Sequence, residues 1–203
     1  MTFTSIPAGT TDWNVPLNAA LQDLQDQISS MGWQPSDHNL KAWTFDPAIA
    51  QSTSAPATGV LQLGKIKLGA AASVTNIIAS VTTVGSGLTS GQNFAGLYNS
   101  SGTRIATTAD QTSSWAGGTG AKTMALSGGP YTLAAGSYYG ALLSVGTTPP
   151  VFQTGHASSS STLNVGLTIG RYLTSGSGLT ALPSSVTLAA ASTSFRAWWF
   201  ALS

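Results

Sequence analysis

Residues 13–31 read WNVPLNAALQDLQDQISSM, and the rest of the chain is organised around this stretch. Its apolar side chains recur at spacings of four, three, four and three residues, which is the a/d pattern of a heptad repeat. The positions are Leu17, Leu21, Leu24, Ile28 and Met31. A seam of so few turns is marginal on its own in water, so it needs partner chains and a larger domain behind it. The stretch therefore predicts a short oligomerising helix that carries a separate head.

Proline in the first turn and glycine after the last turn set the limits of this helix. Pro16 lacks an N–H that would be unpaired there anyway, Asn14 is the better N-cap residue, and Gly32 ends the helix. The flanks of the seam are polar and offer few charges for selective pairing, which suits a trimer as well as a dimer. We favour a trimer. The alternative is one amphipathic helix packed on its own domain, although its apolar stripe is narrower than such helices usually show.

The composition beyond this helix is that of a β-rich head. Of the 203 residues, 42% are hydrophobic and only 6% are charged, far below the usual quarter. Disorder would require more charge and fewer apolar residues.

The charged residues are unevenly distributed along the chain. Residues 1–46 hold one lysine against five aspartates, a balance of −4, and residues 47–203 hold six basic residues against one aspartate, a balance of +5. This asymmetry predicts mild attraction to anionic surfaces and no nucleic-acid site.

Several classes of protein are disfavoured by what the sequence lacks. There is no cysteine, so disulfides, thiolate metal sites and cysteine nucleophiles are excluded. Residues 1–16 do not have the basic start and apolar core of a signal peptide. The most apolar stretch, residues 73–84, is too short and too broken by polar residues to span a bilayer. We therefore expect no membrane insertion, and export as part of an assembled particle if the protein acts outside a cell.

Short strands at even spacing are expected in the head, as in a sandwich or jelly roll. A first strand is expected at 40–46, after a collar at 33–37. The remaining strands are predicted at 60–68, 74–84, 93–99, 103–107, 122–126, 136–145, 151–154, 163–172, 185–190 and 194–202. Between these strands, residues 99–102 and 127–130 contain the Asn, Ser, Gly or Pro residues that favour turns. Residues 156–162 are expected to form an exposed loop. The fold class predicted is mainly β, a jelly-roll-like antiparallel β-sandwich after a short N-terminal coiled coil.

Two stretches resemble a known family. Residues 97–106 read LYNSSGTRIA and continue to Asp110-Gln111-Thr112 and Trp115, and residues 133–143 read LAAGSYYGALL. This pattern resembles the β-sandwich head module of tail-fibre and minor-tail proteins of phages infecting actinobacteria. Residues 12–18, DWNVPLN, are similar to the start of such proteins. The resemblance covers about a third of the chain.

This resemblance implies a homotrimer with an N-terminal attachment segment and a distal head that meets the host surface. The predicted shaft is very short for a long fibre. The sequence therefore departs from the family's usual pattern, which favours a stubby receptor-binding spike or a capsid-surface fibre.

The sequence offers few residues in arrangements that support catalysis. A glycosidase normally needs two carboxylates about 5–10 Å apart, and after residue 46 the chain offers only Asp110. A Ser–His–Asp set can be written from His156, Asp110 and one of many serines, but no nucleophile-elbow context supports it. No His/Asp cluster has the spacing of metal ligands. We therefore expect neither an enzyme nor a metal or cofactor site.

The sequence offers more residues that are suited to binding carbohydrate. Aromatic rings stack on the apolar faces of sugars, and polar side chains beside them fix the orientation of the sugar. The candidate glycan contacts are Trp115, Tyr98, Tyr138, Tyr139, Tyr172 and Arg104. Trp115 is expected to be exposed, because Ser113-Ser114 precede it and Gly117-Gly118 follow it. The alternative for each aromatic residue is a place in the core or a subunit interface.

Four segments are predicted in total: an extended attachment arm at 1–12, the coiled-coil helix at 13–33, a collar and linker with a first strand at 34–58, and the head at 59–203. Phe3, Ile6 and Trp13 are the expected contacts to other virion proteins. The expected function is a non-enzymatic virion protein, a tail fibre or spike that adheres to host surface glycans as a homotrimer. A capsid fibre or head decoration protein without a specific receptor is the alternative.

Overall fold

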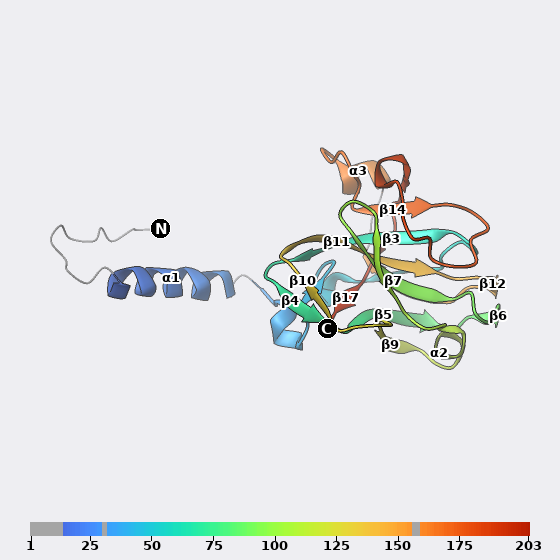
Figure 1. The fold of residues 1–203 in the computed structure, drawn as a ribbon, viewed down its shortest axis with the longest axis horizontal. Coiled ribbons are helices and arrows are strands. Elements are labelled where there is room, and N and C mark those ends of the chain that lie inside the picture. The colour runs from blue at the N-terminus through green and yellow to red at the C-terminus, as the bar shows by residue number, and fades with distance from the viewer. Residues whose placement is uncertain (1–13, 30–31, 156–158) are drawn as a thin grey trace.

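The fold is mainly β, as predicted, with 43% strand and 16% helix. The computed structural model describes residues 14–29, 32–155 and 159–203. Figure 1 shows a head of layered sheets with the long N-terminal helix set apart from it. The strand pairs of the described residues are antiparallel throughout.

Two large sheets and two small ones make up the head. The seven-stranded sheet has the order β1 (Ala42–Trp43), β17 (Ala201–Leu202), β5 (Asn76–Thr83), β13 (Val151–Gly155) and β16 (Ala197–Trp198), with β2 (Ser52–Ser54) paired to β13 and β9 (Gly120–Ala125) paired to β5. The six-stranded sheet has the order β15 (Ser192–Thr193), β14 (Tyr172–Ser175), β3 (Leu61–Leu68), β11 (Gly136–Leu143), β7 (Phe94–Asn99) and β8 (Arg104–Thr107). The small sheets pair β10 (Tyr131–Leu133) with β4 (Ala72–Val74) and β12 (Gly146–Thr148) with β6 (Ser86–Leu88).

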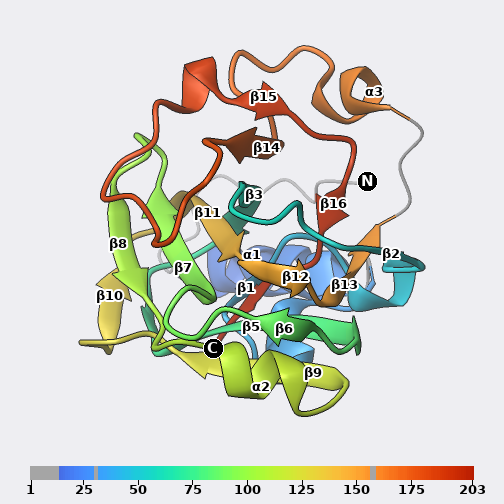
Figure 2. The same cartoon turned by 90° about the vertical axis from the view of Figure 1, so that its right-hand side faces the viewer.

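The main core lies where the two large sheets face each other (Figure 2). The six-stranded sheet contributes Ile66, Leu97 and Leu142, among others, and the seven-stranded sheet contributes Ile77, Val81, Phe152 and Trp198. Phe200 enters this core over two paired glycines, Gly64 and Gly140, whose missing side chains make room for the ring. A Cβ at Gly140 would lie 2.8 Å from Phe200 Cγ.

A second apolar cluster lies on the outer face of the six-stranded sheet. Leu61 and Leu63 of β3 face Leu182, Val186 and Leu188, which lie in the segment that follows β14. This segment includes the short 3-10 helix η3 (Leu188–Ala190). It covers only part of the sheet's outer face, and the part that holds Lys67 is exposed.

Helix α1 spans Asn14–Ser29, so it begins two residues before the predicted Pro16. Its described leucines are turned to solvent, with Leu17 50% exposed, Leu21 55% and Leu24 42%. The seam is thus not packed on the chain's own head at these positions. The side chain of Ile28, all of Met31 and the attachment contacts Phe3, Ile6 and Trp13 lie outside the described residues.

The segment at 34–58, expected to be a collar and linker, contributes more to the head than predicted. It begins with the 3-10 helix η1 (Pro35–His38), then enters the larger sheet as β1, and passes through the 3-10 helix η2 (Pro47–Ile49) to β2. The strand predicted at 40–46 is therefore shortened to two residues, because Asp46 caps η2 by accepting a hydrogen bond from Ala48 N.

The predictions for the last forty residues are partly wrong. Residues 163–172 were expected to form a strand, but Ser159 caps the helix α3 (Ser160–Asn164) by accepting a hydrogen bond from Thr162 N, and the strand begins only at Tyr172. The strand expected at 185–190 contains η3 instead, and 194–202 is divided into β16 and β17. In the loop expected at 156–162, residues 156–158 lie outside the described part of the chain.

Candidate functional site

The predicted exposure of Trp115 is wrong. Its side chain is 0% exposed, because residues 112–116 form the short helix α2 (Thr112–Ala116), which turns the indole into the core. There the ring packs edge-on against Phe152, with centroids 5.1 Å apart. A sugar cannot reach this ring while the head is folded, so Trp115 is a core residue.

Three of the predicted tyrosines are buried as well, and two of their hydroxyls are bonded inside the head. Tyr98 donates to Pro183 O at 2.7 Å, and Tyr139 donates to Gly170 O at 2.9 Å. Burial raises the pKa of Tyr98, and it raises the pKa of Tyr139 to about 12. Burial also raises the pKa of Tyr172, although the neighbouring Arg171 opposes the shift. These rings belong to the interior.

The two remaining candidates, Tyr138 and Arg104, are half-buried and lie on different strands. Tyr138 of β11 donates its hydroxyl to Ala134 O at 2.9 Å and packs against the main core. Arg104 of β8 donates to Leu182 O. Each side chain is thus already held by a backbone carbonyl, and the structure does not gather the six candidates into one site.

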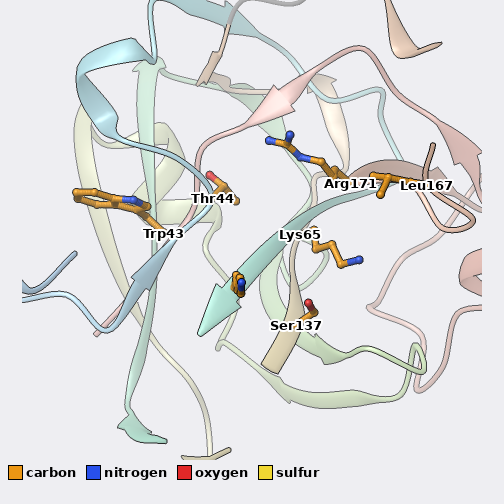
Figure 3. A pocket seen from close by; sticks show the side chains of 7 residues that line it. Trp43, Thr44, Lys65, Ser137, Leu167 and Arg171 are labelled. Carbon is orange, nitrogen blue, oxygen red and sulfur yellow. The ribbon is translucent and has the colours of Figure 1, made fainter. Parts of the chain in front are cut away.

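A different set of side chains lines a groove where α1 enters the head. Two adjoining hollows of about 350 and 530 Å³ share Trp43, Thr44 and Lys67, and we refer to them together as the collar groove. The first is also lined by Lys65, Ser137, Leu167 and Arg171, and the second by residues of η1 and by Lys41, Leu40, Phe45, Gly69 and Ala70, among others. Figure 3 shows Trp43 and Thr44 on one side of the first hollow and Lys65, Ser137, Leu167 and Arg171 on the other.

Strand β3 forms the floor of the collar groove, because its side chains point alternately to the two faces of the sheet. Residues 61, 63, 65 and 67 share one face of the sheet, because successive side chains of a strand point to opposite sides. On this face the strand changes from leucine at 61 and 63 to lysine at 65 and 67. The segment after β14 covers the leucine half. The lysine half stays open and lines the first hollow together with Trp43 and Thr44.

The groove collects four of the seven basic residues of the chain: Lys41, Lys65, Lys67 and Arg171. Lys41, Lys67 and Arg171 are exposed, and Lys65 is half-buried. The backbone joins two of them directly, since Lys65 N donates to Arg171 O at 2.7 Å. Within residues 14–29, 32–155 and 159–203, none of the four forms an ion pair with a carboxylate. Their charges are therefore available to a ligand.

Aromatic rings extend one side of the groove toward the helix. The ring of His38 lies between Trp33 and Trp43, with centroid distances of 5.7 and 5.4 Å and edge-on geometry. Trp33 is 66% exposed and Trp43 is half-buried. The collar groove thus combines flat apolar rings with positive charge. An acidic sugar polymer or a single-stranded nucleic acid is bound by such a combination, since rings stack on the sugars or bases and cations meet the negative groups.

Asp110, the only carboxylate of the chain after residue 46, is engaged in holding loops together. Its Oδ1 accepts from Asn93 N at 3.1 Å and from Thr112 Oγ1 at 3.0 Å. Partial burial raises its pKa, but hydrogen bonds from the backbone of Gly91, Asn93 and Thr112 and from the Thr112 hydroxyl outweigh this and lower the pKa below 3.8. An ionised carboxylate that is held by hydrogen bonds is poorly suited to donate a proton as a general acid.

Comparison with known proteins adds no family. No family model matches the sequence, and no curated protein matches it. No helix in the described part of the chain is long and apolar enough to cross a membrane. Among the same residues, no group of three or more His, Cys, Asp or Glu side chains is placed to hold a metal ion.

Proposed function

We propose that this chain is a non-enzymatic phage virion protein, a tail fibre or spike whose head adheres to glycans on the host cell surface. The observation that carries the proposal is helix α1, which lies apart from the sheets and exposes Leu17, Leu21 and Leu24 along one seam (Figure 1). An apolar seam of this kind is buried when helices of several copies associate. The head is then a jelly-roll-like sandwich presented by a trimeric coiled coil.

The three described leucines alone are too weak to hold three chains together. Full burial of a leucine contributes about 1.5–3 kcal/mol, and these leucines are about half exposed, so each adds roughly 1 kcal/mol. Three leucines in each of three chains give about 9 kcal/mol, whereas each association event costs about 4–15 kcal/mol. Ile28 and Met31, the heads or the N-terminal arm must therefore add contacts. We assign attachment to other virion proteins to that arm, residues 1–12 with Trp13.

The collar groove is the best candidate for the glycan contact. Trp43 offers a ring to the apolar face of a sugar, and Ser137 and the surrounding cations offer hydrogen-bond partners. Tyr138 and Arg104 are less suitable, since both are engaged with backbone carbonyls.

Two measurements on the full chain test the proposal. Light scattering should report a trimer, and Leu21→Asp should lower the mass because it places a charge in the seam. Asn18→Asp adds the same charge to the same helix outside the seam and is the matched control. A wild-type mass equal to one chain at micromolar concentration would refute the trimer.

Adhesion is measured by sedimenting the labelled protein with actinobacterial cell envelopes. Binding that is lost after enzymatic removal of envelope glycans supports the proposal. Absence of binding to every envelope fraction would favour a capsid fibre or decoration protein without a receptor, and immunogold labelling would then place the protein on the capsid.

A further inference from the structure

We infer that the collar groove binds an acidic glycan, a polymer of sugar rings that carry phosphate or carboxylate groups. The inference rests on the proposed function, because it names the chemical class of the surface glycan. Three features of the groove support it: the concentration of positive charge, the absence of ion pairs to these cations among the described residues, and the presence of Trp43 in the lining.

The concentration of charge is unusual for this chain. Only 6% of its residues are charged, yet four of the seven cations line one groove. The four come from three separate parts of the chain, with Lys41 beside β1, Lys65 and Lys67 on β3, and Arg171 before β14. Cations gathered on one open face create a positive potential that attracts anions and speeds their association.

Among the described residues, the acidic side chains nearest in the sequence form no ion pair with these cations. Asp37 accepts from Gln34 N at 2.7 Å, and Asp46 accepts from Ala48 N at 2.8 Å, so both carboxylates are used to cap short helices. The cations' own contacts are with tyrosines: Lys65 Nζ lies 5.7 Å from the centre of the Tyr139 ring, and the Arg171 guanidinium lies 5.6 Å from that of Tyr172, with which its side chain also interacts through a hydrogen bond. Such contacts leave the positive charges able to meet phosphate or carboxylate oxygens.

The position of Trp43 favours a sugar polymer over a simple anion. Trp43 lines both hollows, together with Lys41 and Lys67 in one and with Lys65, Lys67 and Arg171 in the other. A free phosphate would need only the cations. A ligand that uses the whole groove must contact Trp43 with an apolar surface and meet the cations with negative groups, as an acidic glycan chain does.

The row of aromatic rings beside the groove suits a ligand longer than a single sugar. Aromatic rings continue from Trp43 through His38 to the exposed Trp33. A nucleic acid has the same two chemical elements, bases and phosphates. We favour the glycan because the described aromatic rings next to Trp43 meet edge-on, at 67° and 66°, and so do not form parallel platforms for successive bases.

The test is binding of the full chain to polygalacturonate, measured by calorimetry or biolayer interferometry at low and moderate salt. Dextran is the uncharged comparison, and a dT oligonucleotide is the nucleic-acid comparison. The expected result is binding to polygalacturonate that weakens with salt, with weaker or no binding to dextran and to the oligonucleotide. Equal or tighter binding of the oligonucleotide would overturn the glycan assignment.

Variants locate the site. Lys67→Gln removes one charge from the groove, and Lys122→Gln removes one charge from β9 in the other sheet. We expect Lys67→Gln to weaken polygalacturonate binding about three- to fivefold, as an exposed charge contact does, and Lys122→Gln to leave it within error. Equal effects of the two variants would show attraction to net charge alone and would overturn the inference.

A third variant tests contact with the sugar ring. Trp43→Ala should weaken binding about tenfold or more at a salt concentration where the lysine effect is screened, and melting curves establish that the head is folded. If Trp43→Ala cannot be purified, Trp33→Ala tests the exposed end of the same aromatic row. Unchanged affinity in the folded variant would overturn the sugar contact.

Failure of this inference and failure of the proposed function give different results. Envelope binding that is insensitive to salt and to competing polygalacturonate would leave adhesion intact and refute the acidic ligand. Binding to polygalacturonate without binding to any envelope would support the groove's chemistry and refute adhesion to the host.

Discussion

Substitution of Asn93 by alanine is expected to be among the most damaging single changes in the head. The side chain is fully buried and uses its complete hydrogen-bonding capacity. Its Nδ2 donates to Thr89 O at 2.8 Å and to Thr112 Oγ1 at 2.9 Å. Its Oδ1 accepts from Ser144 Oγ at 2.9 Å and from Val145 N at 3.0 Å. One amide thus joins three segments that are distant in the sequence.

The magnitude follows from the groups left behind. Asn93→Ala deprives Ser144 Oγ of this acceptor inside the core and leaves Val145 N without one, and a buried unsatisfied group costs about 1–3 kcal/mol. Some relaxation of the Ser144 hydroxyl reduces the total, so we expect a loss of about 3 kcal/mol in the free energy of unfolding. For a chain of this size that corresponds to roughly 6–12 °C in the melting temperature.

The assay is thermal and urea unfolding followed by circular dichroism. Gln92→Ala is the matched control, because Gln92 is half-buried, its backbone N donates to Thr89 O, and its side chain forms no hydrogen bond with the described residues. We expect the control to remain within about 0.5 kcal/mol of the wild type. A loss below about 1 kcal/mol for Asn93→Ala would refute the reasoning, since it would mean that water or a rearranged loop satisfies the same groups at little cost.

Three further predictions concern packing and pH. Gly140→Ala should lower the free energy of unfolding by about 1–3 kcal/mol, because the added Cβ would overlap the ring of Phe200. Gly69→Ala is the control, since the space around its Cβ is open, and it should be nearly neutral in the same unfolding assay. Because burial raises the pKa of Tyr139 to about 12, its stabilisation is fully present below about pH 10 and is lost as the pH rises through 12; Tyr139→Phe should flatten this alkaline decline. The lowered pKa of Asp110 has the opposite sign, so its stabilisation is present above pH 3.8 and is lost on further acidification, and Asp110→Asn should remove that dependence from an acid-unfolding curve.

The long strands of the head could be predicted because their sequences alternate. The strand expected at 60–68 is found at Leu61–Leu68, and that expected at 136–145 is found at Gly136–Leu143. The elements that were missed are short, such as β6 and β12, or depend on a cap. Ser159 and Asn164 hold α3 and the turn after it through side-chain hydrogen bonds, and these override an apolar pattern that otherwise reads as a strand.

The site was harder to predict for a physical reason. The neighbours of Trp115 in the sequence are serine and glycine, which indicate an exposed loop, but its neighbour in space is Phe152. The collar groove joins residues 41, 65, 67 and 171, and no local pattern connects them. One signal was present: Lys65 and Lys67 are two residues apart in a predicted strand and so share one face. Only pairing of β3 with β14 brings Arg171 beside them.

The pairing of β1 with β17 has a kinetic consequence. Ala42 lies opposite Leu202, so the strand that follows α1 closes the larger sheet only when residues 160 positions later are in place. Folding of such a non-local topology is slow, because the entropy of closing long loops is lost before the pairing compensates for it. Until then β5 has no partner along the edge that β17 occupies, and an unpaired edge is a template for aggregation. Synthesis in cells should therefore yield assembled protein in better proportion at low temperature, where competing association of incomplete heads is slower.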